Sequence, residues 1–263
     1  MNNSSVSTSW LIIPKPIPDA RTRLFVFPYA GGSPAAFWKW PVYLPDSVEV
    51  MLFQFPGKGK RLGESPIVEL PVLIHEIVNE MSLYFDKKFI FFGHSLGALF
   101  AFETIRALRK REILPLHFFV SSGLAPNLPN PRKKIHLLPD EEFIKEIRDL
   151  NGLPQELFQY PDLVEILLNS LRADFSMLCD YEYSPELSLE CPISVYGGVD
   201  DPLVDNKHLS AWQNLTTASF SLKLFKGGHF YFNEDERLFF DTLGHDLDAI
   251  QSYKKNDQMQ IDS

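Results

Sequence analysis

The sequence predicts an α/β fold with a mostly parallel, doubly wound sheet and a helical insertion. Over residues 24–123, short apolar segments alternate with segments of helical pattern. The apolar segments are continuous, which is typical of parallel strands that are buried on both faces of a sheet. The alternation stops over residues 127–190, where helical patterns follow one another, and it resumes at residue 193. We therefore expect one domain over residues 21–253, with the insertion inside it.

Length and composition are those of a globular domain. The chain has 263 residues, of which 45% are hydrophobic and 22% charged, enough for a sizeable core. The formal net charge of −9 argues against a nucleic-acid partner. Two cysteines, Cys179 and Cys191, make neither a disulfide framework nor a metal cluster. We expect a cytoplasmic protein without a bound metal.

The first 20 residues are rich in Ser, Asn and Pro, and we expect a flexible lead-in there. They lack the basic start of a signal peptide, and prolines interrupt the short apolar segment at residues 10–13. No apolar stretch of the sequence approaches the 18 residues or more that indicate a transmembrane helix. We therefore expect no membrane association.

The first half of the sheet is expected to hold four strands. Ser33 and Pro34 are typical of a helix start, as N-cap and first helical residue. The predicted strands cover residues 24–27, 48–55, 89–92 and 117–121. The predicted helices between them cover residues 34–44, 70–86 and 98–111.

The insertion over residues 127–190 carries three helical patterns, at 140–150, 161–171 and 171–181. They could be ordinary crossover connections. Three helices in a row without a strand instead favour a lid over the sheet, which we call the lid insertion.

The alternation then resumes to complete the sheet. Strands are predicted at residues 193–196 and 220–225, and helices at 206–215 and 234–253. The polar tail over residues 254–263 is expected to fray.

The sequence Gly93-His94-Ser95-Leu96-Gly97 lies between a predicted strand and a predicted helix. This is the G-x-S-x-G pattern in the context of a nucleophile elbow, where glycines let strand and helix approach a strained serine. A glycine-rich turn with an incidental serine is the alternative. The flanking elements favour Ser95 as a catalytic nucleophile.

A serine nucleophile needs a base and a carboxylate that orients the base. His229 follows the last predicted strand, whereas the other histidines lie in predicted helices, strands or less favourable loops. Asp200 and Asp201 both follow the preceding strand, and Asp201 is favoured because Pro202 fixes the chain after it. The order Ser95, Asp201, His229 is that of α/β-hydrolases.

The oxyanion of such a reaction needs two N–H donors. The amide of Leu96, directly after the nucleophile, is one candidate. The second is expected in the turn after the first sheet strand, where Ala30 is favoured and Tyr29 or Gly31 is possible.

Five motifs in this order resemble the type II thioesterases, the stand-alone editing enzymes of nonribosomal peptide and polyketide synthesis. The medium-chain acyl thioesterase of fatty acid synthesis is similar as well. The resemblance covers about residues 22–250. The motifs are Phe27-Pro28-Tyr29-Ala30-Gly31-Gly32-Ser33, Phe55-Pro56-Gly57-Lys58-Gly59-Lys60-Arg61, Gly93-His94-Ser95-Leu96-Gly97-Ala98, Gly198-Val199-Asp200-Asp201-Pro202 and Gly227-Gly228-His229-Phe230.

The resemblance implies an α/β-hydrolase fold and hydrolysis of acyl thioesters on the phosphopantetheine arm of acyl or peptidyl carrier proteins. The purpose would be editing or chain release, and the enzyme would need no cofactor of its own. We expect a monomer, although nothing in the sequence specifies the oligomeric state. A broader serine esterase or acyl-CoA hydrolase is the alternative. A non-catalytic binding protein of the same fold is a third possibility, which the three reactive residues disfavour.

A carrier domain is usually acidic, so a net negative enzyme would need a local basic or apolar docking surface. Two basic clusters are candidates, and a solvated charged loop is the alternative for each. The family often has Arg where this chain has Lys58 and Lys60. The candidates are Lys58, Lys60 and Arg61 in one loop and Arg132, Lys133 and Lys134 in the lid insertion.

Overall fold

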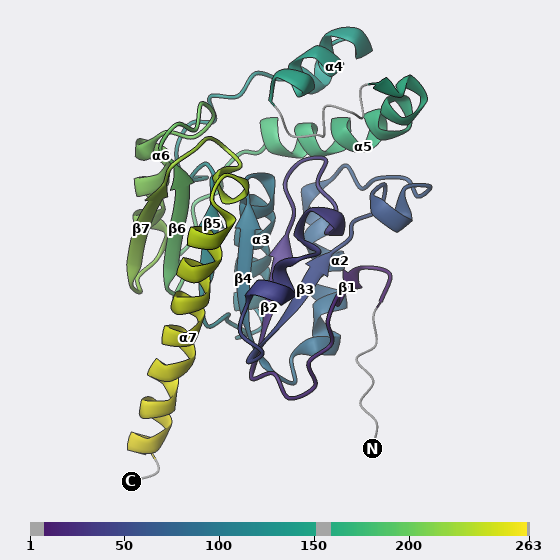
Figure 1. Ribbon diagram of the computed structural model, residues 1–263. Coiled ribbons are helices and arrows are strands. Elements are labelled where there is room, and N and C mark those ends of the chain that lie inside the picture. The colour runs from purple at the N-terminus through teal and green to yellow at the C-terminus, as the bar shows by residue number, and fades with distance from the viewer. Residues whose placement is uncertain (1–7, 151–158, 262–263) are drawn as a thin grey trace.

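The computed structural model describes residues 8–150 and 159–261. Seven strands form one sheet in the order β1-β3-β2-β4-β5-β6-β7, and every neighbouring pair is parallel except β1 with β3 (Figure 1). The predicted α/β class with a mostly parallel sheet is confirmed. The strands are β1 (Leu11–Ile12), β2 (Thr22–Phe27), β3 (Val48–Phe53), β4 (Lys88–His94), β5 (Phe118–Ser121), β6 (Ile193–Gly198) and β7 (Phe220–Phe225).

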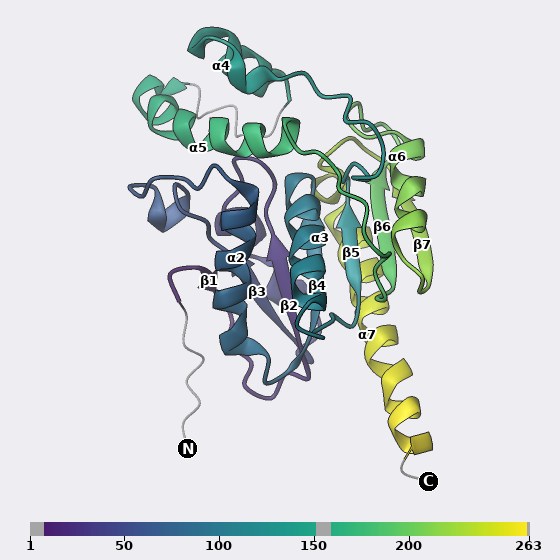
Figure 2. The same cartoon turned by 180° about the vertical axis from the view of Figure 1, so that it is seen from behind.

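Helices cover both faces of this sheet. Helices α2 and α3 lie on one face and α7 on the other, as the opposite views of Figures 1 and 2 show. The helices are α1 (Trp40–Tyr43), α2 (Leu70–Met81), α3 (Leu96–Arg109), α4 (Asp140–Asp149), α5 (Pro161–Cys179), α6 (Asn206–Ala211) and α7 (Glu236–Ile261). Short 3-10 turns are η1 (Pro34–Phe37), η2 (Gly59–Arg61), η3 (Ser82–Tyr84), η4 (Ile135–Leu137), η6 (Trp212–Leu215) and η7 (Tyr231–Asn233).

The continuous apolar strands supply both cores, because successive side chains point to opposite faces of a sheet. In β4, Phe89 and Phe91 join the core under α2 and α3, whereas Ile90 and Phe92 join the core under α7. This explains why the strand sequence does not alternate between apolar and polar residues.

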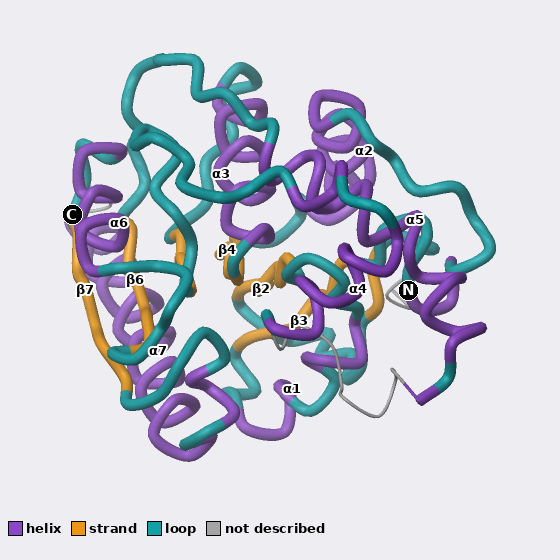
Figure 3. Tube along the Cα trace, turned by 90° about the horizontal axis from the view of Figure 1, so that it is seen from above, coloured by secondary structure: helices purple, strands orange, loops and turns teal. Residues whose placement is uncertain are grey.

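The lid insertion leaves the sheet after β5 and returns at β6. Its helices α4 and α5 lie across the carboxyl ends of the strands (Figures 1 and 3). Helix α5 is one continuous helix of 19 residues, although the sequence predicted two helices that meet at Leu171. Leu171 is buried in the core, so the pattern of apolar residues continues without a break there.

The expectation of a flexible lead-in over residues 1–20 is wrong for its second half. Strand β1 pairs antiparallel with β3, with Leu11 opposite Phe53. Trp10 and Leu11 are buried, and the Trp10 ring packs edge-on against Phe55. The apolar segment that was too short for a signal peptide therefore protects the edge of the sheet.

Two predicted helix boundaries also differ from the structure. The helix expected over residues 34–44 is divided into η1 and α1, and Pro41 lies in the second piece, where it has no N–H to continue a longer helix. Pro34 does begin η1, but the Ser33 side chain makes no cap hydrogen bond. The last helix was expected to end at residue 253, whereas α7 continues to Ile261.

No helix in the described part of the chain combines the length and the apolar character that crossing a membrane requires.

Candidate active site

Ser95 lies at the sharp turn between β4 and α3. Its backbone has φ 54° and ψ −115°, in the positive-φ region that an L residue rarely adopts. A Cβ on Gly97 would lie 2.1 Å from the Phe27 carbonyl oxygen, and one on Gly93 would lie 2.4 Å from the Gly97 carbonyl oxygen. Both glycines are therefore needed for strand and helix to meet around Ser95, as the G-x-S-x-G pattern predicts.

His229 and Asp201 form a pair beside this turn. His229 Nδ1 lies 2.8 Å from Asp201 Oδ2, and the two side chains are 8% and 1% exposed. The other carboxylate oxygen, Oδ1, accepts from the amides of Leu203 at 2.8 Å and Val204 at 3.3 Å. Asp200 is exposed. Of the two neighbouring aspartates, Asp201 is therefore the one whose carboxylate orients His229.

The surroundings keep Asp201 ionised. Burial raises the pKa of this carboxyl, but hydrogen bonds from His229 and the Leu203 amide, and the charge of His229, outweigh burial and lower it. An ionised carboxylate on Nδ1 leaves Nε2 of His229 to accept a proton.

The turn after β2 is where the second oxyanion donor was expected. The Gly32 amide donates to the Tyr29 carbonyl at 2.8 Å, and Gly31 has φ 76°. The Gly31 amide donates to Asp174 Oδ2 at 2.7 Å. Of the candidates Tyr29, Ala30 and Gly31, the Gly31 amide is thus already engaged. Ala30 remains the favoured donor together with Leu96, whose amide is in the first turn of α3, where N–H groups lack intrahelical acceptors.

Ser95 and His229 line the same cavity. It has a volume of about 330 Å³, and its lining includes Ser95, His229, Tyr29 and Ala30. The lid insertion contributes apolar side chains such as Phe175 and Leu178 to its wall. A second cavity of about 400 Å³ also reaches Ser95 and is lined by residues 124–130 and 181–183. Ser95 therefore lies where two cavities meet.

Buried hydrogen bonds connect His94, Ser121 and Tyr231 next to the site. His94 Nδ1 lies 2.9 Å from Ser121 Oγ, which lies 2.7 Å from the Tyr231 hydroxyl. The rings of His94 and His229 are 5.1 Å apart. Complete burial lowers the pKa of His94 well below its usual value, and the nearby His229 lowers it further. His94 is therefore a neutral neighbour of the base.

The structure corrects the prediction that Lys58 belongs to an exposed docking surface. Lys58 is buried and forms an ion pair with Asp174 of helix α5. Arg61 lies over the Trp10 ring at 4.5 Å and bonds Glu64. In this loop, Lys60 is exposed, but two of the three cations serve internal contacts.

The three cations of the second basic cluster, residues 132–134, also have different surroundings. Lys134 Nζ bonds Asp180 at 2.7 Å, whereas Arg132 and Lys133 line the Ser95 cavity. Burial lowers the pKa of Arg132 to about 10. Sequence reasoning placed Arg132 on a docking surface and missed its position beside the nucleophile, because nothing local in the sequence shows how the loop after β5 folds back.

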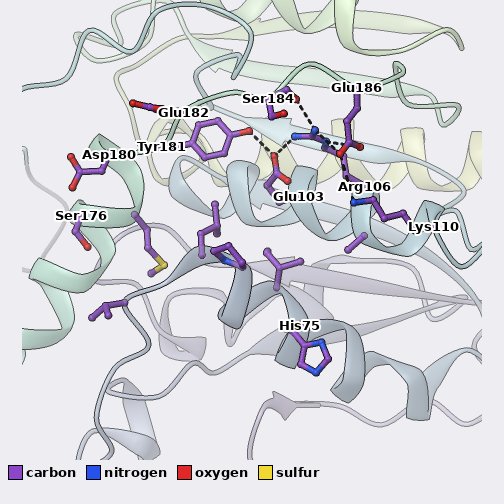
Figure 4. A pocket seen from close by; sticks show the side chains of 16 residues that line it. His75, Glu103, Arg106, Lys110, Ser176, Asp180, Tyr181, Glu182, Ser184 and Glu186 are labelled. Atoms are coloured by element: carbon purple, nitrogen blue, oxygen red, sulfur yellow. Dashed lines mark hydrogen bonds and ion pairs between the residues drawn. The ribbon is translucent and has the colours of Figure 1, made fainter.

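Another cavity, of about 660 Å³, lies between α2, α3 and the segment after α5 (Figure 4). Several polar groups of its lining bond one another: Tyr181 donates to Glu103 at 2.6 Å, and Arg106 bonds Glu103 and the Ser184 carbonyl. These bonds connect the end of the lid insertion to α3. Ser95 and His229 do not line this cavity, so we assign the chemistry to the Ser95 cavity.

Comparisons with known proteins agree with this geometry. A family model, the thioesterase domain, matches residues 22–247. The gramicidin S biosynthesis protein GrsT of Aneurinibacillus migulanus is 40% identical over 218 residues, 82% of this chain and 85% of GrsT. LgrE of Brevibacillus parabrevis, named linear gramicidin dehydrogenase, is 39% identical over 258 residues, 96% of this chain and 97% of LgrE.

A solved structure is similar as well. The type II thioesterase BorB from the borrelidin biosynthetic cluster superposes with a TM-score of 0.84 at 31% identity. The superposition covers 92% of this chain and 99% of BorB.

Proposed function

The chain belongs to the thioesterase family, and we propose that it hydrolyses acyl thioesters on the phosphopantetheine arm of a carrier protein in nonribosomal peptide or polyketide synthesis. The observation that carries this proposal is the buried His229–Asp201 pair, in which His229 lines the same cavity as the strained Ser95. The relatives from gramicidin S and borrelidin biosynthesis support the kind of pathway. The reaction is editing of stalled groups or chain release.

The chemistry draws on side chains, backbone amides and water. Ser95 Oγ attacks the thioester carbonyl while His229 takes its proton, and Asp201 stabilises the imidazolium that forms. The amides of Leu96 and Ala30 hold the oxyanion. The C–S bond then breaks, and the leaving sulfur takes the proton from the His229 imidazolium, which restores the base; the thiol leaves easily because its pKa is only about 8.5. Water that is activated by His229 then releases the acyl group from Ser95.

A dehydrogenase, the activity in the name of the LgrE relative, is less consistent with this chain. A dinucleotide-binding turn carries glycines in the pattern G-x-G-x-x-G after its first strand. The turn after β2 reads Pro28-Tyr29-Ala30-Gly31-Gly32 and lacks that spacing. The nucleophile elbow is therefore the better candidate for the centre of activity.

The test compares kcat/KM on an acyl-carrier protein, the same acyl group on coenzyme A, and a p-nitrophenyl ester. We expect the carrier substrate to be preferred. A preference for the oxygen ester would indicate a broader serine esterase instead, and failure of a fluorophosphonate to label the folded protein would indicate a non-catalytic binding role.

Paired variants test the assigned roles. Asp201→Asn is expected to lower kcat by about 10⁴, because the base loses its orienting carboxylate. Asp200→Asn, a matched change one residue away on the surface, should keep wild-type activity. Ser95→Ala should abolish labelling and hydrolysis together. Equal losses in the two aspartate variants would contradict the assignment of Asp201.

A further inference from the structure

We propose that Asp174 is a positioning residue: from helix α5 of the lid insertion, it holds the turn Tyr29–Gly32 in the shape that forms the oxyanion site. The inference rests on the proposed function, in which the Ala30 amide is an oxyanion donor. In this inference, the orientation of the Ala30 amide depends on the position of the lid insertion.

The first observation is a junction of three segments that are far apart in the sequence. Asp174 Oδ2 accepts both the Gly31 amide, at 2.7 Å, and the Lys58 ammonium. Gly31 belongs to the turn after β2, Lys58 to the loop after β3, and Asp174 to α5. A single carboxylate oxygen thus joins the catalytic turn to the lid insertion.

The second observation is that this junction is buried. The side chains of Lys58 and Asp174 are 5% and 4% exposed. A buried charge is tolerated only when it is paired and hydrogen-bonded, so Lys58 and Asp174 each depend on the other. A hydrogen bond from an amide to an ionised carboxylate is also stronger than one to a neutral acceptor.

The third observation concerns the turn itself. Its internal bond, from the Gly32 amide to the Tyr29 carbonyl, spans four residues and leaves the peptide between Ala30 and Gly31 without support from within the turn. A peptide is planar, so fixing the Gly31 N–H fixes the whole unit that begins at the Ala30 carbonyl. Asp174 therefore sets the backbone on the carboxyl side of Ala30, whereas the peptide that carries the Ala30 N–H is held through the Tyr29 carbonyl, so the two bonds together fix the orientation of Ala30.

The placement of Asp174 depends on the lid insertion. Its neighbours Leu171 and Phe175 on α5 are buried in the core, and Figures 1 and 3 show α5 lying across the carboxyl ends of the strands. Gly57, with φ 80°, lies beside Ser170 of the same helix, where an added Cβ would be 3.2 Å from Ser170 Oγ. The loop after β3 therefore also packs against α5, close to the ion pair.

The experiment measures two kinds of ligand affinity beside activity in the full-length protein. An acyl-pantetheine trifluoromethyl ketone adds Ser95 and places an oxyanion in the site. A thioether analogue, in which CH₂ replaces the carbonyl, binds without one. Asp174→Ala should lower kcat/KM by up to about 10²–10³, as loss of an oxyanion donor does. Ketone affinity should fall in parallel and thioether affinity should stay unchanged.

Further variants separate positioning from stability. Asp174→Asn keeps an oxygen that can accept from Gly31, so its loss should be intermediate, and Lys58→Arg should retain most of the activity. Glu49→Gln is the control for burial: it disturbs the Arg23–Glu49 pair, 9% and 1% exposed, near the amino ends of β2 and β3 and away from the carboxyl ends where the site lies. It should leave ketone affinity unchanged.

The outcomes distinguish the two proposals. If the wild-type enzyme is active and both Asp174 variants bind the ketone as tightly as wild type does, the role of Asp174 is overturned and the proposed function stands. Equal losses of ketone and thioether affinity mean general damage to the site and also overturn it. A folded wild-type protein that neither hydrolyses thioesters nor binds the ketone overturns the proposed function and this inference together.

Discussion

At the scale of single residues, environment decides which histidine can act as a base. His94 adjoins the nucleophile in sequence, but it is completely buried and its pKa is lowered by burial and by the nearby His229. A neutral His94 does not oppose the imidazolium that forms on His229 during catalysis. The sequence favoured His229 because it follows the last strand, and the contact with Asp201 supports that interpretation.

His117 gives a pH-dependent prediction at the same scale. Its Nε2 lies 2.8 Å from Ser194 Oγ, and burial lowers its pKa from 6.5 to about 4. The unfolded chain then binds more protons than the folded one between these values, so stability rises with pH across that window. We expect the free energy of unfolding to fall from pH 6.5 toward pH 4, with one histidine contributing up to about 1.4 kcal/mol per pH unit.

The measurement is urea unfolding of wild type and His117→Gln at several pH values. The difference between the two curves should shrink as the pH falls toward 4, because the variant has no imidazole to protonate. If the free energies of unfolding of wild type and variant changed with pH in parallel across this range, His117 would not have a lowered pKa in the folded protein.

At the scale of elements, contacts across the lid insertion were less predictable than the elbow. The Gly93–Gly97 pattern is local, so strand, turn and helix could be predicted from adjacent residues. The Asp174–Lys58 pair joins α5 to a loop 116 residues earlier, and neither sequence segment shows that the other lies beside it. Lys58 was a candidate for the docking surface because it lies in a basic loop that could attract an acidic carrier domain.

The connection between α3 and the segment after α5 gives a stability prediction. Arg106 is 7% exposed and pairs with Glu103 and Glu186, whereas Lys110 is 69% exposed and lies 3.7 Å from the same Glu186 (Figure 4). Arg106→Met removes the cation that Glu103 and Glu186 share and the donor to the Ser184 carbonyl, although Glu103 keeps Tyr181 and Glu186 keeps Arg109. It should lower the free energy of unfolding by about 2 kcal/mol. Lys110→Met, the matched control, should cost less than about 1 kcal/mol.

Chemical denaturation of both variants checks this. Similar losses in the two would show that the burial of Arg106 does not strengthen its ion pairs.

At the scale of the whole molecule, the predictable part was the buried architecture. The continuous apolar strands predicted a parallel sheet. In such a sheet the carboxyl ends of β4, β6 and β7 lie on the same side, so Ser95, Asp201 and His229 were expected close together. Strand β1 was missed because two residues carry no periodicity. The position of Arg132 in the cavity was missed because loops fold according to contacts that lie elsewhere in the chain.

Net charge gives a prediction at this scale. The chain carries −9, and an acidic carrier domain is repelled over a distance that shortens from about 30 Å at 10 mM salt to about 8 Å at 150 mM. We expect kcat/KM for an acyl-carrier substrate to rise between these salt concentrations. The value for the uncharged acyl-N-acetylcysteamine should stay constant. A fall for the carrier substrate would instead indicate docking on exposed cations such as Lys60 and Lys133.

Because α5 is one continuous helix, a small tilt about one end moves its residues by different distances. Its 19 residues span about 28 Å, and its carboxyl end is held where Asn130 Nδ2 bonds the Leu178 carbonyl at 2.8 Å. A tilt of about 10° about that end moves the start of the helix by about 5 Å but moves Asp174 by only about 1.3 Å. That smaller movement still exceeds what a 2.7 Å hydrogen bond to Gly31 tolerates. A contact that tilts the helix at the exposed Leu163 and Ile166, near its amino end, would thus reach the catalytic turn as a movement on the scale of one hydrogen bond.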